Sequence, residues 1–138
     1  LNIIEFMTQE NKELLLKDLC ARLPYGVKCE NYNHIDGRNV FKVTDIRDNG
    51  YICGIINNHY CWAVFDPLEL KPYLFPLSSM TEEQKMFLKQ QNWCIAISTS
   101  GTVETTIEGI DWLNKNHFDY RGLIEKGLAI DATGLNVY

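Results

Sequence analysis

Residues 27–75 carry the pattern that most restricts the fold of this chain, because short β-type runs alternate there with turn residues and no helical period intervenes. Runs rich in β-branched and aromatic residues favour strands. Asp36-Gly37, Asn49-Gly50 and Asn57-Asn58 suit the positive-φ positions of tight hairpins. The sequence therefore predicts an antiparallel meander, with strands at residues 27–32, 39–46, 51–56, 59–65 and 68–75.

Short twisted strands without intervening helices tend to close on themselves, because closure removes exposed strand edges. The pattern thus favours a small antiparallel, SH3-like barrel, with an open meander sheet as the alternative. The last strand contains Pro72 and is followed by Pro76, and proline cannot donate a ladder hydrogen bond. We expect this strand at an edge of the sheet, where it would permit a homodimer; a monomer is the other state considered.

A helical pattern precedes the predicted sheet. Residues 8–23 repeat leucines at helical spacing, with Thr8 as the expected N-cap and Pro24 as the stop. Residues 1–6, ahead of Met7, are interpreted as a cloning remnant or an upstream extension. We expect them to have no part in the function.

Helical patterns also follow the predicted sheet. Thr81 and Gln84 have capping-box spacing, which predicts a helix over residues 81–91. Trp93 begins a short β-type run at residues 93–98. Two helices are expected within residues 103–127, the second capped by Asp119. Together these elements predict a single α+β domain spanning residues 1–138.

The composition excludes several classes of protein. Hydrophobic residues make up 46% and charged residues 22% of the chain, which is typical of a folded globular domain. The 13 lysines and arginines are scattered and outnumbered by 18 acidic residues, so general affinity for nucleic-acid backbones is not expected. No apolar stretch approaches the roughly 20 residues that span a bilayer. We expect a cytoplasmic protein with no membrane partner.

Cysteine and histidine would supply a metal site or a nucleophile. The set Cys29, His34, Cys53, His59 and Cys61 matches no zinc-binding spacing. No metal or other cofactor is therefore predicted, and most of the five cysteines are interpreted as buried thiols in a reducing compartment. A small hydrolase or metal protein built on these residues is the third functional alternative.

Aromatic residues of the predicted sheet form the first candidate surface. Tyr60 and Trp62 share one side of their strand, and Tyr73 belongs to the last strand. Exposed, these rings would bind a peptide or single-stranded nucleic acid. The alternative is that they are core, because a chain with 12% aromatic residues must bury most of them.

A polar cluster near the C-terminal end forms the second candidate surface. It consists of His117, Asp119, Tyr120 and Arg121, with Glu125 and Lys126 beside them. Arg121 in such a cluster can bind a phosphate or carboxylate with two parallel hydrogen bonds. The alternative is structural: Asp119 caps a helix, Tyr120 packs with a polar tip, Glu125 pairs with Arg121 four residues earlier, and His117 ends the preceding helix.

Two blocks, residues 71–83 and 112–130, resemble small uncharacterised proteins encoded by phages, prophages and mobile elements of gut bacteria. The family has no established activity, so the resemblance implies a genomic context and carries no catalytic residue over to this chain. We therefore expect a non-enzymatic accessory protein that binds another protein. The alternative is a nucleic-acid-binding protein acting through the barrel or the two terminal helices.

Overall fold

The computed structural model describes residues 3–33, 37–47, 51–64, 70–99 and 101–138, and it has an α+β fold, as predicted. The helices are α1 (Ile3–Arg22), α2 (Glu82–Gln90) and α3 (Ile107–Lys115), with 3-10 turns η1 (Leu23–Tyr25) and η2 (Leu77–Ser79). The strands are β1 (Lys28–Asn33), β2 (Gly37–Ile46), β3 (Tyr51–Ile56), β4 (His59–Val64), β5 (Leu70–Pro76), β6 (Ala96–Ile97), β7 (Val103–Glu104), β8 (Phe118–Asp119) and β9 (Ile130–Asp131).

The antiparallel meander is confirmed for its first four strands. β1 to β4 pair in sequence order, and β5 returns to pair antiparallel with β1. The turn between β3 and β4 is made by Asn57 and Asn58 at φ values of 50° and 67°, so the expected hairpin is present. The other two predicted turns, Asp36-Gly37 and Asn49-Gly50, involve residues outside the described part of the chain.

The predicted edge position of β5 is wrong. Its first residues pair with β1, while its second half forms parallel ladders with β8 and β9. Leu74 accepts a hydrogen bond from Ala132 and Phe75 donates one to the His117 carbonyl. β5 therefore lies between β1 and β8 in the sheet and has hydrogen-bonded neighbours on both edges. Its ladders are only two or three residues long, which is how the strand accommodates two prolines.

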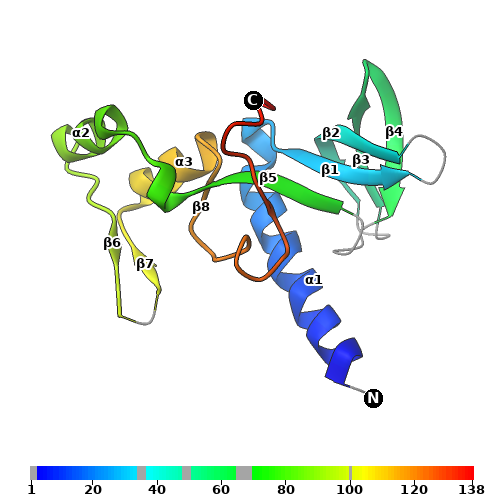
Figure 1. Ribbon diagram of the computed structural model, residues 1–138, viewed down its shortest axis with the longest axis horizontal. Helices are drawn as coiled ribbons and strands as arrows, with labels where there is room; N and C mark the ends of the chain where they lie inside the picture. Colours follow the sequence, from blue (N-terminus) through cyan, green and yellow to red (C-terminus); the bar gives the residue numbers. More distant parts are fainter. Residues whose placement is uncertain (1–2, 34–36, 48–50, 65–69, 100) are drawn as a thin grey trace.

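The sheet pairings do not show the predicted SH3-like barrel. Among the described residues the ladder runs from β4 to β5 and its neighbours, with no pairing that joins β4 back to β5. A register shift between Val43 and Asp45 bends β2 against β3. Figure 1 shows the resulting sheet as strongly twisted, with β1 to β4 gathered at one end of the molecule.

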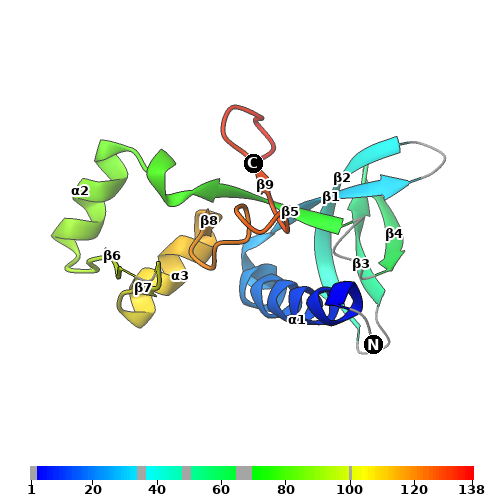
Figure 2. The ribbon, with the colours of Figure 1, turned by 60° about the horizontal axis from the view of Figure 1, so that its bottom comes forward.

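Helix α1 lies against one face of this sheet (Figures 1 and 2) and begins before Thr8. Thr8 is therefore inside the helix, and the prediction that it is the N-cap is wrong. Leu15 and Leu19 of α1 are fully buried against the sheet. The core that they share consists of Val27, Cys29, Phe41, Val43, Ile52, Leu70, Leu74, Leu123, Leu128 and Ala129.

The chain after β5 departs most from the predicted secondary structure. Helix α2 has the expected capping box between Thr81 and Gln84. The predicted strand at residues 93–98 shortens to β6, which pairs only with β7 in a separate two-stranded sheet. The second of the two expected helices is absent: after β8, residues 120–127 form turns.

Gly54 of β3 packs directly against the Phe41 ring and the Lys42 backbone of the neighbouring strand β2. A Cβ built there would overlap the backbone carbonyl oxygen of Lys42 and lie 2.6 Å from the Phe41 ring. Phe41 is fully buried, so neither the ring nor the paired backbone has room to withdraw. Glycine is required at this position for close approach rather than for its dihedral freedom.

We expect Gly54→Ala to lower the free energy of unfolding by about 2 kcal/mol, because it overpacks the core against fixed backbone. Chemical denaturation monitored by circular dichroism measures this. The control is Val40→Ala on β2, whose side chain is 42% exposed and should change stability by less than about 0.5 kcal/mol. Equal stability of Gly54→Ala and the parent protein would contradict this account of the packing.

Candidate docking groove and the buried polar cluster

Aromatic contacts hold α2 at a fixed distance from the sheet. Phe87 of α2 stacks on Trp112 of α3, with ring centroids 6.3 Å apart, and Trp112 stacks on Phe118 of β8 at 5.6 Å. Phe118 in turn contacts Phe75 of β5 at 6.1 Å. The series places α2 and the β6–β7 hairpin at the end of the molecule opposite β1 to β4 (Figures 1 and 2).

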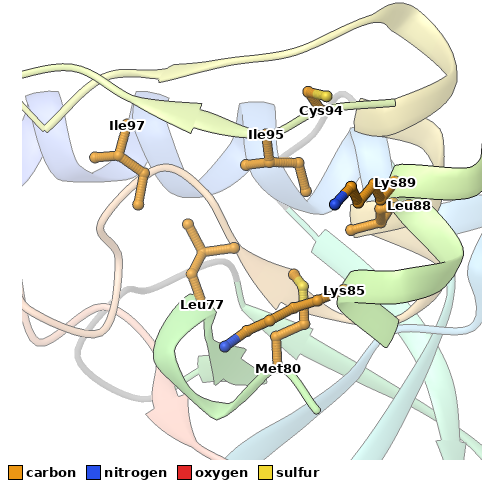
Figure 3. A pocket seen from close by; sticks show the side chains of 8 residues that line it. All are labelled: Leu77, Met80, Lys85, Leu88, Lys89, Cys94, Ile95 and Ile97. Atoms are coloured by element: carbon orange, nitrogen blue, oxygen red, sulfur yellow. The ribbon is translucent and has the colours of Figure 1, made fainter. Parts of the chain in front are cut away.

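A groove of about 470 Å³ opens between α2 and the strand residues leading into β6. Figure 3 shows Ile95 and Ile97 directed from the strand side toward Leu77 and the α2 side. Ile97 is 60% exposed, so apolar surface reaches the mouth of the groove. The lining residues, which we call the α2 groove, are Leu77, Met80, Lys85, Leu88, Lys89, Cys94, Ile95 and Ile97.

Both charged residues of the α2 groove are cations. Lys85 and Lys89 are exposed and four residues apart on α2, so they are neighbours on one face of the helix. Lys85 forms an exposed ion pair with Glu82 at 3.2 Å, which water screens strongly. Lys89 makes no ion pair with any residue that the structure describes. The groove is therefore a local positive site on a chain of net charge -5.

A second hollow, of about 320 Å³, adjoins the α2 groove and shares Leu77 and Ile97 with it. It extends toward the turns after β8, and we call it the turn hollow. Its exposed charged residue is Glu125. The remaining lining residues are Pro76, Ser78, Gly101, Val103, Asp119, Tyr120, Gly122 and Ile124.

A buried ion network connects α1 to the turns after β8. Asp18 and Arg22, one helical turn apart, are both fully buried and paired at 2.8 Å. The second carboxylate oxygen of Asp18 accepts from Arg121 at 3.1 Å. Arg22 also donates to the Phe118 carbonyl at 2.6 Å. One carboxylate thus holds two arginines that are distant in sequence.

The predicted polar candidates are consumed by this network and by the turn beside it. Asp119 is 8% exposed and accepts backbone hydrogen bonds from Arg121, Leu123 and Ile124. It therefore has the capping role proposed from the sequence, although it caps a turn and not a helix. Its carboxylate has little remaining capacity for a ligand.

Tyr120 and Arg121 are also engaged within the protein. The Tyr120 hydroxyl donates to Asn114 at 2.9 Å and accepts from Arg121 at 3.1 Å. The guanidinium carbon of Arg121 lies 4.8 Å from the centre of the Tyr120 ring. Two donor groups of Arg121 are thus used by Asp18 and Tyr120. Among the described residues Arg121 pairs with Asp18 and not with Glu125, the partner expected in the structural alternative.

His117 forms part of a clasp for the C-terminal residue. Its ring stacks on Tyr138 with centroids 3.5 Å apart, and its Nδ1 is buried with no hydrogen-bond partner among the described atoms. The Tyr138 hydroxyl accepts from the Lys28 backbone N–H and donates to the Tyr73 carbonyl, both at 2.9 Å. The clasp therefore joins β1 and β5 through a side chain.

Burial, with smaller contributions from the positive charges of Arg22 and Lys28, lowers the pKa of His117 to about 4. The ring is therefore neutral near pH 7. Its backbone has a φ of 63°, a region that favours asparagine among residues with a side chain.

The aromatic candidates of the sheet have three different positions. Tyr60 is 78% exposed on β4. Trp62 pairs with Cys53 in the ladder, while its side chain lies outside the described part of the structure. Tyr73 is 8% exposed within β5, so its ring is largely buried. These residues do not meet at one described surface.

The prediction that most cysteines are buried is also wrong. Cys29 and Cys53 are buried, Cys61 is half-buried, and Cys20 and Cys94 are exposed. Burial raises the pKa of Cys29 well above its ordinary value, with a smaller contribution from Asp18, which makes this thiol a poor nucleophile. Within the described residues, no three His, Cys, Asp or Glu side chains are placed to hold a metal ion. His34, one of the suggested ligands, is outside those residues.

The α2 groove was not predicted from the sequence. Its elements were expected separately, as a helix over residues 81–91 and a strand over 93–98. The alternation of Ile95 and Ile97 around Ala96 indicates one apolar strand face, but it does not say whether that face is covered. The uncovered face results from β6 pairing with β7 and not with the main sheet.

Comparisons of the chain with family models, curated proteins and solved structures give no match. Of the helices in the described residues, none combines the length and apolar character that crossing a membrane requires.

We expect Asp18→Asn to lower the free energy of unfolding by about 3 kcal/mol, because it leaves buried Arg22 without a counter-ion. The amide also turns an N–H group toward one of the two arginines. Denaturant unfolding measures the loss. Asp111→Asn, an exposed change on α3, is the control and should alter stability by less than about 0.5 kcal/mol. A loss no larger than that of the control would refute the role assigned to this carboxylate.

Acid should destabilise the protein through His117. Its folded pKa of about 4 lies below the ordinary value of 6.5, so between these values the unfolded chain binds more protons than the folded chain. Stability should fall as the pH falls from about 6.5 to about 4, by an amount on the order of 2 kcal/mol from this residue.

His117→Asn is the matched variant, because asparagine accepts the positive φ and does not titrate. Its free energy of unfolding, measured by denaturant titration at pH 7 and pH 4.5, should fall less with acid than that of the parent protein. Parallel pH profiles for the two proteins would exclude His117 as the source of the acid sensitivity.

Proposed function

We propose that this chain is a non-enzymatic protein-binding module whose binding site is the α2 groove. The observation that carries the proposal is the exposed apolar lining centred on Ile97, next to two lysines that face solvent. Exposed contiguous apolar surface with a polar rim is a feature of interaction sites. The polar cluster that would otherwise suggest chemistry is used to hold α1 against the turns after β8.

The proposal also covers the genomic origin of the protein and its cellular compartment. The resemblance of residues 71–83 and 112–130 to proteins of phages and mobile elements supports an accessory role in such an element. The five free cysteines support a reducing compartment such as the cytoplasm. Lys85 and Leu88 of α2 and the strand at Ile97 are then the parts of the protein that a partner contacts.

Affinity capture from a lysate of the native host tests the site, using three baits with and without nuclease treatment. The parent protein and Ile107→Glu should retain the same partner, because Ile107 is 80% exposed outside the groove. Ile97→Glu places a charge in the apolar lining and should reduce recovery more than about tenfold. Circular dichroism confirms that each bait is folded.

Two other results would contradict the proposal. Equal recovery of the partner by Ile97→Glu and Ile107→Glu would move the binding site away from the α2 groove. Recovery that disappears with nuclease in every bait would replace protein binding by nucleic-acid binding, which steep dependence on salt would verify.

A further inference from the structure

The α2 groove and the turn hollow adjoin each other, with exposed cations lining the first and an exposed carboxylate lining the second. Leu77 and Ile97 line both, so the two hollows have apolar surface in common. Lys85 and Lys89 lie at the α2 end, and Glu125 lies in the turn hollow. A surface of this form discriminates both the charge pattern and the direction of an elongated ligand.

We propose that this surface binds a linear peptide segment of a partner protein, with an apolar centre, carboxylates at the end over α2 and a cation at the end over Glu125. This inference rests on the proposed function and names its ligand. The α2 groove, at about 470 Å³, lies within the roughly 300–1,000 Å³ of sites that enclose small ligands, so it accepts a few apolar side chains and not a domain face.

Charge complementarity selects the occupant. The neighbouring lysines of α2 match two carboxylates about one helical turn apart in a bound helix or two residues apart in a bound strand. Glu125 is exposed and makes no ion pair with a described residue. It therefore remains available to a lysine or arginine of the peptide. With opposite charges at its ends, the site favours one direction of binding over the reverse.

The positions of the side chains in the groove support the binding of a peptide with an apolar centre. Figure 3 shows Lys85 extending along the α2 side, with Leu77 and Ile97 beyond it. Leu88 is 5% exposed at the base of the groove, whereas Ile97 is 60% exposed at its mouth. A bound apolar side chain would contact Leu88 and cover Ile97. The net charge of -5 over the whole chain makes the local attraction of carboxylates a property of this site and not of the surface as a whole.

Selection from a displayed library of random linear peptides provides the probe. Enriched peptides should share an apolar centre flanked by acidic residues on one side and a basic residue on the other. A fluorescein-labelled peptide of the enriched sequence is then titrated by fluorescence anisotropy against the full chain. A second peptide with its acidic and basic ends exchanged tests direction and should bind about tenfold more weakly, because each end then meets a like charge.

Three protein variants locate the contacts. Lys85→Glu with Lys89→Glu should weaken binding of the enriched peptide by about tenfold or more, since attraction becomes repulsion at that end. Replacing the acidic residues of the peptide with lysine should restore part of the affinity to this variant. Glu125→Lys should weaken the parent peptide separately. Lys17→Glu with Lys42→Glu, at exposed positions that line neither hollow, is the control of equal charge change and should leave affinity unchanged.

The outcomes separate this inference from the proposed function. One such outcome is that the enriched peptides lose binding to Ile97→Glu and yet lack the charge pattern. Another is that they lose this binding but bind the Lys85→Glu, Lys89→Glu variant as well as the parent protein. Either result would show that the proposed ligand is wrong while the groove remains the binding site. Enriched peptides that bind Ile97→Glu normally would overturn both. If no peptide is enriched, binding of laurate to the parent protein and to Ile97→Glu is measured. Laurate binding that is lost in Ile97→Glu would identify the ligand as a fatty acid and overturn the inference.

Discussion

The arrangement of the helices and the C-terminal region depends on the buried pairing of the Asp18 carboxylate with two arginines. It pairs with Arg22 in α1 and with Arg121 after β8, while Arg22 reaches the Phe118 carbonyl. Two buried arginines without this carboxylate would face a large desolvation penalty. The pairing therefore sets where the chain after α3 returns to α1, and β8 consequently lies beside β5.

From this fixed position the aromatic contacts extend toward α2. Phe118 stacks on Trp112, and Trp112 stacks on Phe87, so the wall of the α2 groove is positioned by packing from the sheet outward. Residues 94–97, which lead into β6, form the other wall, and β6 pairs with β7 in a sheet separate from the main one. The groove thus has one wall supported by aromatic stacking and one wall formed by a short strand segment. A site built between such elements can present apolar surface because neither wall needs the other for its own hydrogen bonds.

The polar cluster illustrates why charged residues near each other in sequence are weak evidence for a ligand site. His117, Asp119 and Arg121 are adjacent in the chain, yet they serve three separate structural contacts: a stack on Tyr138, a turn cap and the pair with Asp18. The partners of His117 and Arg121 come from opposite ends of the sequence. Local spacing correctly indicated the capping by Asp119, because a cap is a local interaction. It could not indicate that Arg121 bonds to a residue of the first helix.

The sequence by itself determined the meander and the capped helix α2, because alternation, tight-turn residues and capping boxes act between residues close along the chain. It therefore predicted β3 at Tyr51–Ile56 and the Asn57-Asn58 turn correctly. Tertiary structure decided the partners of β5, the replacement of a predicted helix by turns after Asp119, and the separation of β6 from the main sheet. Each depends on contacts between distant segments, such as Asp18 with Arg121 and Phe75 with Phe118. The α2 groove is of this second kind, since an apolar strand face becomes a binding surface only when folding leaves it uncovered.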